Sequence, residues 1–361
     1  MIKSLEGGRG FAALIVALFH LKIAAPHISL IRNGYLLVDL FFVLSGFLIC
    51  SAYKNKLENK DAIGPFLLRR FGRLFPLLVF ASLVFVLAQA GNVFAKNLLV
   101  ELGYAKFSTH VGMLPYAIPT AAEIVATLTM THGMGVFDKL ILNYASWSIS
   151  VEFYTYILFA CLCFLLRGRL RLLVFAALGL LAFAVTVWAS VDVHQCYLQG
   201  HCMDVTFDFG FARCVASFFL GVLTYGLSRS VRFDANLLQG VALGLTLLVF
   251  GFVGTLPALA FFCPLLFALL VLSVCGDTGF LAQLFKRAPF QVLGQRSYSI
   301  YMMHPVILIA FEPVVKRATG HAFLEAGVLL AYVAVVFLVS GWTYKWIEDP
   351  WRIRFNRLAL A

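Results

Sequence analysis

The chain has 361 residues, of which 62% are hydrophobic and 12% are charged. Soluble domains carry roughly 25% charged residues, so this composition excludes a soluble globular protein and indicates a polytopic helical membrane protein. The formal net charge of +11 does not indicate nucleic-acid binding, because the basic residues are spread thinly between apolar segments.

Apolar segments recur along the whole chain and predict an all-α fold, a bundle of about ten transmembrane helices forming a single membrane domain over residues 1–361. With a cytoplasmic amino terminus, 20 of the 28 Lys and Arg residues fall on the cytoplasmic side, which satisfies the positive-inside rule and predicts that both termini are cytoplasmic. Segment 91–146 is then an external loop, and 347–361 a short cytoplasmic tail. The predicted spans are 10–26, 34–53, 74–90, 147–166, 172–190, 210–227, 237–254, 257–275, 297–313 and 324–346.

The first span brings a histidine into the membrane. His20 follows Arg9 after ten residues, which places it about 16 Å further along a helix, near mid-membrane. Asp39, early in the second span, lies within roughly two turns of the same depth if the two helices form an antiparallel hairpin. We therefore predict that Asp39 holds the His20 tautomer, so that the other ring nitrogen acts as a general base. The alternative is a structural histidine that bonds a backbone carbonyl.

Ser45 and Gly46 lie near the middle of the second span. We predict that the pair belongs to a ligand site in the membrane core, where hydrogen-bond donors can stabilise an oxyanion. A small residue in a membrane helix also permits close helix packing, and Gly46 can serve both purposes.

The most basic loop, 54–73, ends in FLLRRFGRLFP and contains Arg69, Arg70 and Arg73. Arg70 and Arg73 are three residues apart, so they share one helical face. Guanidinium groups bind phosphate in a bidentate manner, which predicts a cytoplasmic site for a phosphate-rich ligand. Charges that only set the topology are an equally good explanation from sequence alone.

The predicted external loop contains an apolar piece at 118–130 that is too short to span a membrane and predicts an interfacial or re-entrant segment. The fourth span opens with SWSISVEFYTY, so that Glu152 lies in its first turns and should face the bundle interior. Arg213, just inside the sixth span at the same external end, is the predicted salt-bridge partner. A purely structural ion pair competes with a catalytic role for Glu152.

Only two of the eight cysteines, Cys196 and Cys202, share a polar loop. This loop is predicted to be external, where a disulfide can form. The neighbouring His194 and His201 allow a metal site as the weaker alternative. No CxxC or HExxH spacing supports a metal centre, and we expect none.

Near the carboxyl end, His304 precedes Pro305 in the ninth span. The proline frees a carbonyl near His304 and should kink the helix, which explains the histidine structurally as well as a catalytic role does. The chain ends in KWIEDPWRIRF, in which Glu348 and Asp349 are predicted to lie at the surface among basic residues.

Six motifs in this order resemble the acyltransferase-3 family of integral membrane O-acyltransferases, along nearly the whole chain. Two positions depart from the family pattern: Gly8 replaces a usual leucine, and Phe153 follows Glu152 where a second acidic residue is common. The second change argues against a catalytic carboxylate at position 153. The motifs are SLEGGRGFAALIVALFH, GYLLVDLFFVLSGFLI, RRFGRLFP, SWSISVEFYTY, QRSYSIYMMHP and WIEDPWR.

The resemblance implies an enzyme of the bacterial inner membrane that modifies carbohydrates. Acetyl-CoA or another acyl-CoA would bind from the cytoplasm, with its phosphates near Arg69, Arg70 and Arg73. The acceptor would be a hydroxyl of a surface or lipid-linked glycan, and membrane lipids would surround the protein. By this resemblance, Arg9 and His20 would be the pair essential for activity. Ser45 and Gly46 would belong to the membrane core of the enzyme, and Arg70 and Arg73 to the cytoplasmic site for the acyl donor.

Two mechanistic and two functional alternatives remain open at this point. The acyl group can move directly to the acceptor, or first to His20 or Ser45 in a two-step reaction. A secondary transporter would use His20, Asp39, Glu152 and Arg213 as an intramembrane relay, although the two halves of the chain share no motif. A scaffolding protein would leave the Arg9–His20 interval and the cytoplasmic arginines unexplained.

Overall fold

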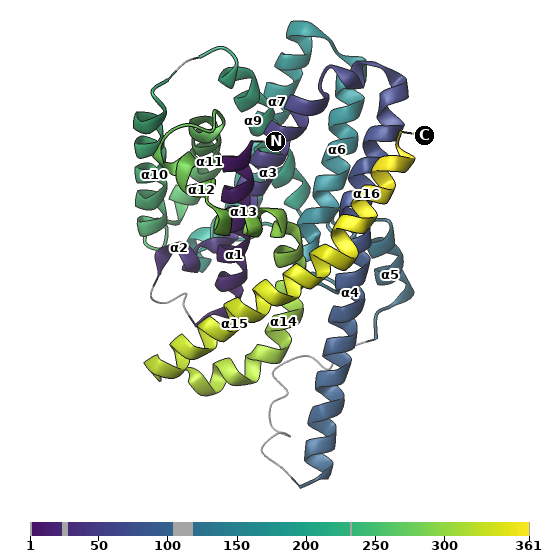
Figure 1. The fold of residues 1–361 in the computed structure, drawn as a ribbon, viewed down its shortest axis with the longest axis vertical. Coiled ribbons are helices and arrows are strands. Elements are labelled where there is room, and N and C mark those ends of the chain that lie inside the picture. The colour runs from purple at the N-terminus through teal and green to yellow at the C-terminus, as the bar shows by residue number, and fades with distance from the viewer. Residues whose placement is uncertain (1, 24–27, 104–117, 232, 361) are drawn as a thin grey trace.

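The computed structural model describes residues 2–23, 28–103, 118–231 and 233–360. These ranges contain helices and turns and no strand, which confirms the all-α prediction. Ten of the described helical segments are long and apolar enough to cross a membrane, the number the sequence predicts. The bundle is shown in Figure 1. The cytoplasmic location of the two termini stays a prediction.

Ten helices form the body of the bundle, and shorter helices connect them. The long ones are α1 (Lys3–Leu21), α3 (Leu37–Tyr53), α4 (Ile63–Glu101), α6 (Trp147–Leu165), α7 (Gly168–Trp188), α9 (Gly210–Ser228), α10 (Ala235–Phe252), α11 (Cys263–Val274), α14 (Ser297–Ala318) and α15 (Ala322–Thr343). The connecting ones are α2 (Ser29–Arg32), α5 (Ala121–Leu128), α8 (Cys196–Gln199), α12 (Phe280–Phe285), α13 (Ala288–Gln295) and α16 (Asp349–Leu358).

Helix α1 begins seven residues before the predicted span and ends at Leu21, where Lys22 adopts a left-handed conformation with φ 62°. The amino-terminal residues are therefore part of the helix, and Asp277 accepts hydrogen bonds from the free backbone N–H groups of Lys3 and Ser4 at its first turn. As a result His20 lies in the last turn of α1 rather than in the middle of the span.

Helix α4 is much longer than the predicted third span. It has 39 residues, or about 58 Å at the usual helical rise, and it continues to Glu101. The first part of the predicted external loop 91–146 is thus helical, because the apolar pattern of the span continues into it. Within the same loop, the short apolar piece contains a single short helix, α5, and its interfacial or re-entrant location stays a prediction. Residues 104–117 lie outside the described residues.

The carboxyl end is a continuation of the bundle rather than a separate surface tail. Helix α15 passes through π-helical Tyr344–Glu348 into α16, and this long run crosses α4 in Figure 1. Phe355 of α16 packs directly against Gly72 of α4. Glu348 is only 5% exposed and accepts a hydrogen bond from Ser299 at 2.8 Å, so its predicted surface position is wrong.

Helices α3 and α9 make the closest contact in the bundle core. A Cβ atom at Gly46 would lie 1.9 Å from the carbonyl oxygen of Phe218, and one at Gly221 would lie 2.0 Å from that of Val43. Each glycine therefore lets the backbone of the other helix approach, which is the packing that small residues give in membrane helices.

Candidate active site

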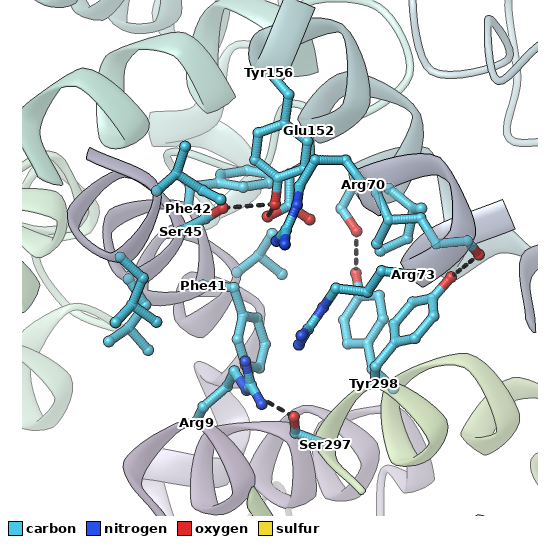
Figure 2. Close-up of a pocket in the computed structure, with 18 of the residues that line it drawn as sticks. Arg9, Phe41, Phe42, Ser45, Arg70, Arg73, Glu152, Tyr156, Ser297 and Tyr298 are labelled. Carbon is cyan, nitrogen blue, oxygen red and sulfur yellow. Dashed lines mark hydrogen bonds between the residues drawn. The ribbon is translucent and has the colours of Figure 1, made fainter. Parts of the chain in front are cut away.

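A cavity of about 470 Å³ opens between α1, α3, α4, α6 and α14. Its wall is largely apolar, with four charged side chains on it: Arg9, Arg70, Arg73 and Glu152. Figure 2 shows the three guanidinium groups reaching into this space from different sides, with Glu152 beside Arg70. Ser45 also lines the cavity, so the structure brings five of the predicted site residues into one place.

Arg9 is held at the cavity wall by α13 and α14. Its Nε donates to the hydroxyl of Ser297 at 2.8 Å, and its NH2 group donates to the carbonyl of Gly294 at 3.2 Å. Gly294 itself is required there, because a Cβ atom would meet the backbone of Glu6 at 2.4 Å. These contacts leave the NH1 group of Arg9 available to a ligand in the cavity.

Arg70 and Arg73 line the cavity from the same face of α4, as their spacing predicted. Arg69 does not line it, and its guanidinium lies 6.0 Å from the ring of Tyr53, which does. Arg70 lies 5.7 Å from the same ring. The Nε atoms of Arg69 and Arg70 are buried and have no hydrogen-bond partner within the described part of the chain, so both guanidinium groups retain unused donors there.

Glu152, beside Arg70, belongs to a short chain of hydrogen bonds in the cavity wall. Tyr156, one turn further along α6, donates to Glu152 at 2.6 Å, and its oxygen lies 2.8 Å from the hydroxyl of Ser45. Because the Tyr156 hydrogen is used on the carboxylate, Ser45 must donate to Tyr156. Ser45 then has no hydrogen left for an oxyanion, which removes the reason for assigning it that role. The i, i+4 spacing of Glu152 and Tyr156 in the sequence could have predicted their contact.

Asp39 contacts Arg213 and not His20, which corrects two predictions at once. Arg213 donates to the Asp39 carboxylate through NH2 at 2.7 Å and through Nε at 3.1 Å, and Ser217 donates to it at 2.9 Å. The carboxylate therefore has no role in orienting His20, and Arg213 is not the partner of Glu152. Asp39 and Arg213 lie on the neighbouring helices α3 and α9, whereas sequence depth alone does not tell which helices are neighbours.

Gly46 is likewise placed away from the cavity. It does not line the cavity wall, and the position of its missing side chain faces Phe218 on α9. Of the two roles that the sequence allowed, close packing is the one that the geometry supports.

His20 lies at the far end of α1 from Arg9, in a second polar group that does not line the cavity. Its Nδ1 is 2.9 Å from the carbonyl of Val16, so Nδ1 carries the hydrogen and Nε2 carries a lone pair. The rings of His304 and Tyr144 lie 4.8 Å and 5.2 Å from the His20 ring. Sequence reasoning missed Tyr144 altogether, since it lies in a single 3-10 helical turn, Tyr144–Ser146, just before α6.

Tyr301 separates the two groups. It lines the cavity, its hydroxyl is hydrogen-bonded to that of Ser148 at 2.8 Å, and its ring lies 5.8 Å from the ring of His304. Phe41 contacts Tyr301 edge to face at 5.7 Å and lines the same wall. A ligand in the cavity is therefore one aromatic layer away from the histidines.

The polar loop 194–208 contains the disulfide between Cys196 and Cys202. Its carbonyl groups are tied to the core, because Tyr35 donates to Cys202 at 3.1 Å and Arg213 donates to Val205 at 3.2 Å. His194 pairs with Asp208 at 2.6 Å. Over the residues that the structure describes, no group of three or more His, Cys, Asp or Glu side chains could hold a metal ion.

The fold and the cavity define an integral membrane protein with a cavity lined by arginines between its helices. Residues 2–345 match the model of the acyltransferase domain, so the chain belongs to the acyltransferase-3 family and the predicted resemblance is confirmed. No solved structure matches the chain.

Curated relatives in three bacteria match over nearly the whole chain. YrhL of Bacillus subtilis is 26% identical over 97% of this chain and 55% of its own length. The peptidoglycan O-acetyltransferase OatA of Listeria monocytogenes is 23% identical over 97% and 56%, and the O-acetyltransferase OatA of Staphylococcus aureus is 22% identical over 97% and 57%. The chain thus spans little more than half the length of these relatives.

Proposed function

We propose that the protein is an inner-membrane O-acyltransferase that moves an acetyl or other short acyl group from acyl-CoA to a hydroxyl of a surface or lipid-linked carbohydrate. The observation that carries the proposal is the cavity in which Arg9, Arg70 and Arg73 converge. Its volume lies in the range of small-molecule sites, and it combines an apolar wall with a few charged groups.

The donor's phosphates would bind at the arginines. Guanidinium groups form charge-assisted hydrogen bonds with phosphate, and three of them offset the charge of a CoA anion. The pantetheine arm would lie along the apolar wall, with the thioester toward Tyr301 and Ser148. Glu152 would keep Arg70 and the Tyr156–Ser45 pair in place rather than react itself.

His20 would act as the general base. Its bond to Val16 leaves the Nε2 lone pair free to take the proton of the acceptor hydroxyl. The hydroxyl oxygen then attacks the thioester carbonyl, the C–S bond breaks, and the CoA thiolate receives the proton from the imidazolium. Direct transfer and a two-step path through an acyl-enzyme are distinguished by whether label from the donor remains on denatured protein.

The relatives support the proposed class of acceptor. OatA of Listeria monocytogenes is described as a peptidoglycan O-acetyltransferase, which supports a carbohydrate polymer as acceptor here. The membership of the acyltransferase-3 family favours an enzyme over the transporter that the sequence left open. The residues of the transporter's intramembrane relay also do not contact one another as a group, because Asp39 and Arg213 pair with each other and Glu152 pairs with Tyr156.

The test is acetyl transfer in inverted membrane vesicles, to which labelled acetyl-CoA is added on the cytoplasmic face. We expect label on membrane glycan with the native protein and none with His20→Ala at equal expression. His321→Ala is the control, because His321 is exposed in the turn before α15. Equal labelling by native protein and His20→Ala would show that His20 is structural, and no labelling by either would refute the acetyl-CoA donor.

A further inference from the structure

His304 is a buried histidine with one unused nitrogen. It is fully buried, and its Nε2 has no hydrogen-bond partner among the described residues. Buried polar atoms without a partner are rare, because each loses its hydration without compensation. Such an atom beside a candidate catalytic histidine is free to accept a hydrogen bond from a bound molecule.

The tautomer of His304 is fixed by the residue that follows it. Pro305 has no N–H, so it cannot donate to the carbonyl of Tyr301 four residues earlier as a helical residue would. His304 Nδ1 takes that place at 2.6 Å. Nδ1 therefore carries the hydrogen, and the unpartnered Nε2 presents a lone pair.

His20 and His304 carry their ring hydrogen on the same nitrogen. His20 also donates from Nδ1 to a carbonyl, that of Val16, and its ring centre lies 4.8 Å from that of His304. Two hydrogen-bond acceptors thus lie side by side. Tyr144 adds a buried hydroxyl that has no partner in the part of the chain that the structure describes, on a ring 6.2 Å from that of His304.

A single acceptor hydroxyl has one hydrogen and satisfies only one of the two imidazoles. We propose that His304 binds a second hydroxyl of the same acceptor, so that the site selects molecules with two neighbouring hydroxyl groups, one donating to His20 and the other to His304. This inference rests on the proposed function. Transfer itself needs no additional atom: the hydroxyl at His20 loses its proton and gains the acyl group, and the one at His304 stays intact.

The proposal explains why both histidines are held in the same tautomer, and it names a chemical class of acceptor. Carbohydrates carry hydroxyl groups on adjacent carbons, whereas simple alcohols and most lipid chains do not. One neutral hydrogen bond contributes about tenfold to the preference between acceptors that have or lack the second hydroxyl.

Two substitutions separate ligand binding by His304 from its structural bond. In His304→Asn the amide reaches the position of Nδ1 and keeps the bond to Tyr301, but nothing replaces Nε2. In His304→Gln the amide reaches the position of Nε2, where its oxygen can accept a hydrogen bond. Tyr332→Phe is the control, because the Tyr332 hydroxyl donates to the backbone carbonyls of Ala17 and His304 without belonging to the cluster.

The experiment measures acetyl transfer from labelled acetyl-CoA to 1,2-propanediol and to 1-propanol by purified protein in lipid nanodiscs. We expect the native protein and Tyr332→Phe to prefer the diol about tenfold, His304→Asn to lose the preference, and His304→Gln to retain part of it. Tyr144→Phe, which removes no hydrogen bond among the described residues, tests whether Tyr144 rather than His304 binds the second hydroxyl, and on our proposal this variant still prefers the diol.

Equal use of the two alcohols by the native protein, or an unchanged preference in His304→Asn, would overturn the inference. Failure to acetylate either alcohol while membrane glycan is labelled would also overturn it, because a pair of hydroxyls would then not suffice for recognition. If His304→Asn does not fold, the preference of His304→Gln for the diol decides. A native preference in His304→Gln together with loss of the preference in Tyr144→Phe would assign the second hydroxyl to Tyr144. The proposed function fails separately, when His20→Ala labels glycan as the native protein does.

Discussion

Asp39 on α3 and Arg213 on α9 form a buried ion pair, with a nitrogen–oxygen distance of 2.7 Å and side chains that are 0% and 1% exposed. Arg213 extends the link beyond the two helices, because its NH2 group also donates to the carbonyl of Tyr35 and its NH1 group donates to the carbonyl of Val205. One side chain thus ties α3, α9 and the loop that carries the disulfide. The pair joins the two helices that the reciprocal contacts of Gly46 and Gly221 bring together.

The first prediction concerns the charge of Asp39. Asp39→Asn leaves the Arg213 guanidinium buried without a counter-charge, so we expect a loss of about 3–5 kcal/mol of folding stability. Ser217→Ala removes one hydrogen bond to the same carboxylate and should cost only about 1 kcal/mol. Thermal unfolding in detergent measures both. A variant Asp39→Asn of native stability with low acetyl transfer would instead support the role beside His20 that the structure argues against.

The glycine contacts give the second prediction. Gly221→Ala places a methyl group against the carbonyl of Val43, so the helices must separate, and we expect a loss of roughly 1–3 kcal/mol. Gly226→Ala, on the same helix α9, meets no atom within 4 Å and should be neutral or stabilising by up to about 1 kcal/mol. The melting temperatures of the two purified variants test this prediction. Equal melting temperatures would show that the contact between α3 and α9 tolerates a side chain.

The number and type of the helices could be predicted from sequence, because apolar length and low charge are local properties. The ends of the helices were less predictable. Helix α1 begins at Lys3, and the carboxylate of Asp277, 274 residues away, accepts a hydrogen bond from the backbone N–H of Lys3. Charge and polarity in the first residues suggested a later start. Tertiary contacts of this kind override local pattern.

The candidate site could be predicted only where it depends on local spacing within one helix. The spacing of Arg70 and Arg73 fixes their common face within one helix, and the structure has them there. The partner of Asp39 depends instead on the order in which helices pack, and two ionisable groups, His20 and Arg213, were available at similar depth. Glu348 was misplaced because it is buried against α14, where Ser299 donates to its carboxylate, and the polar sequence around it did not indicate this contact.

The third prediction tests the disulfide and the side of the membrane on which it lies. The bond between Cys196 and Cys202 closes a short loop and should contribute about 2 kcal/mol, so Cys196→Ser with Cys202→Ser should lower the melting temperature. In intact cells, a membrane-impermeant thiol reagent should label these cysteines only after an impermeant reductant is added. Labelling without reduction would show free thiols, and labelling only in inverted vesicles would place the loop in the cytoplasm.

The fourth prediction concerns the arginines of the cavity. If Arg70 and Arg73 bind the phosphates of acetyl-CoA, Arg73→Gln should raise the KM for acetyl-CoA about 10-fold to 100-fold, since a hydrogen bond to a charged group contributes about 1.5–3 kcal/mol. Acetyl-pantetheine, which lacks the nucleotide, should be used equally by the native protein and the variant. Arg169→Gln is the control, because Arg169 is an exposed residue near the start of α7 that does not line the cavity.

The comparison of two donors makes this last prediction specific to phosphate binding. A variant that merely unfolds part of the cavity would lose activity with both donors, whereas loss of a phosphate contact affects acetyl-CoA alone. Raising the salt concentration should weaken the use of acetyl-CoA by the native protein and have less effect on Arg73→Gln, because one attractive charge is already gone. An unchanged ratio of the two donors in Arg73→Gln would assign the arginines to topology, the alternative that their sequence left open.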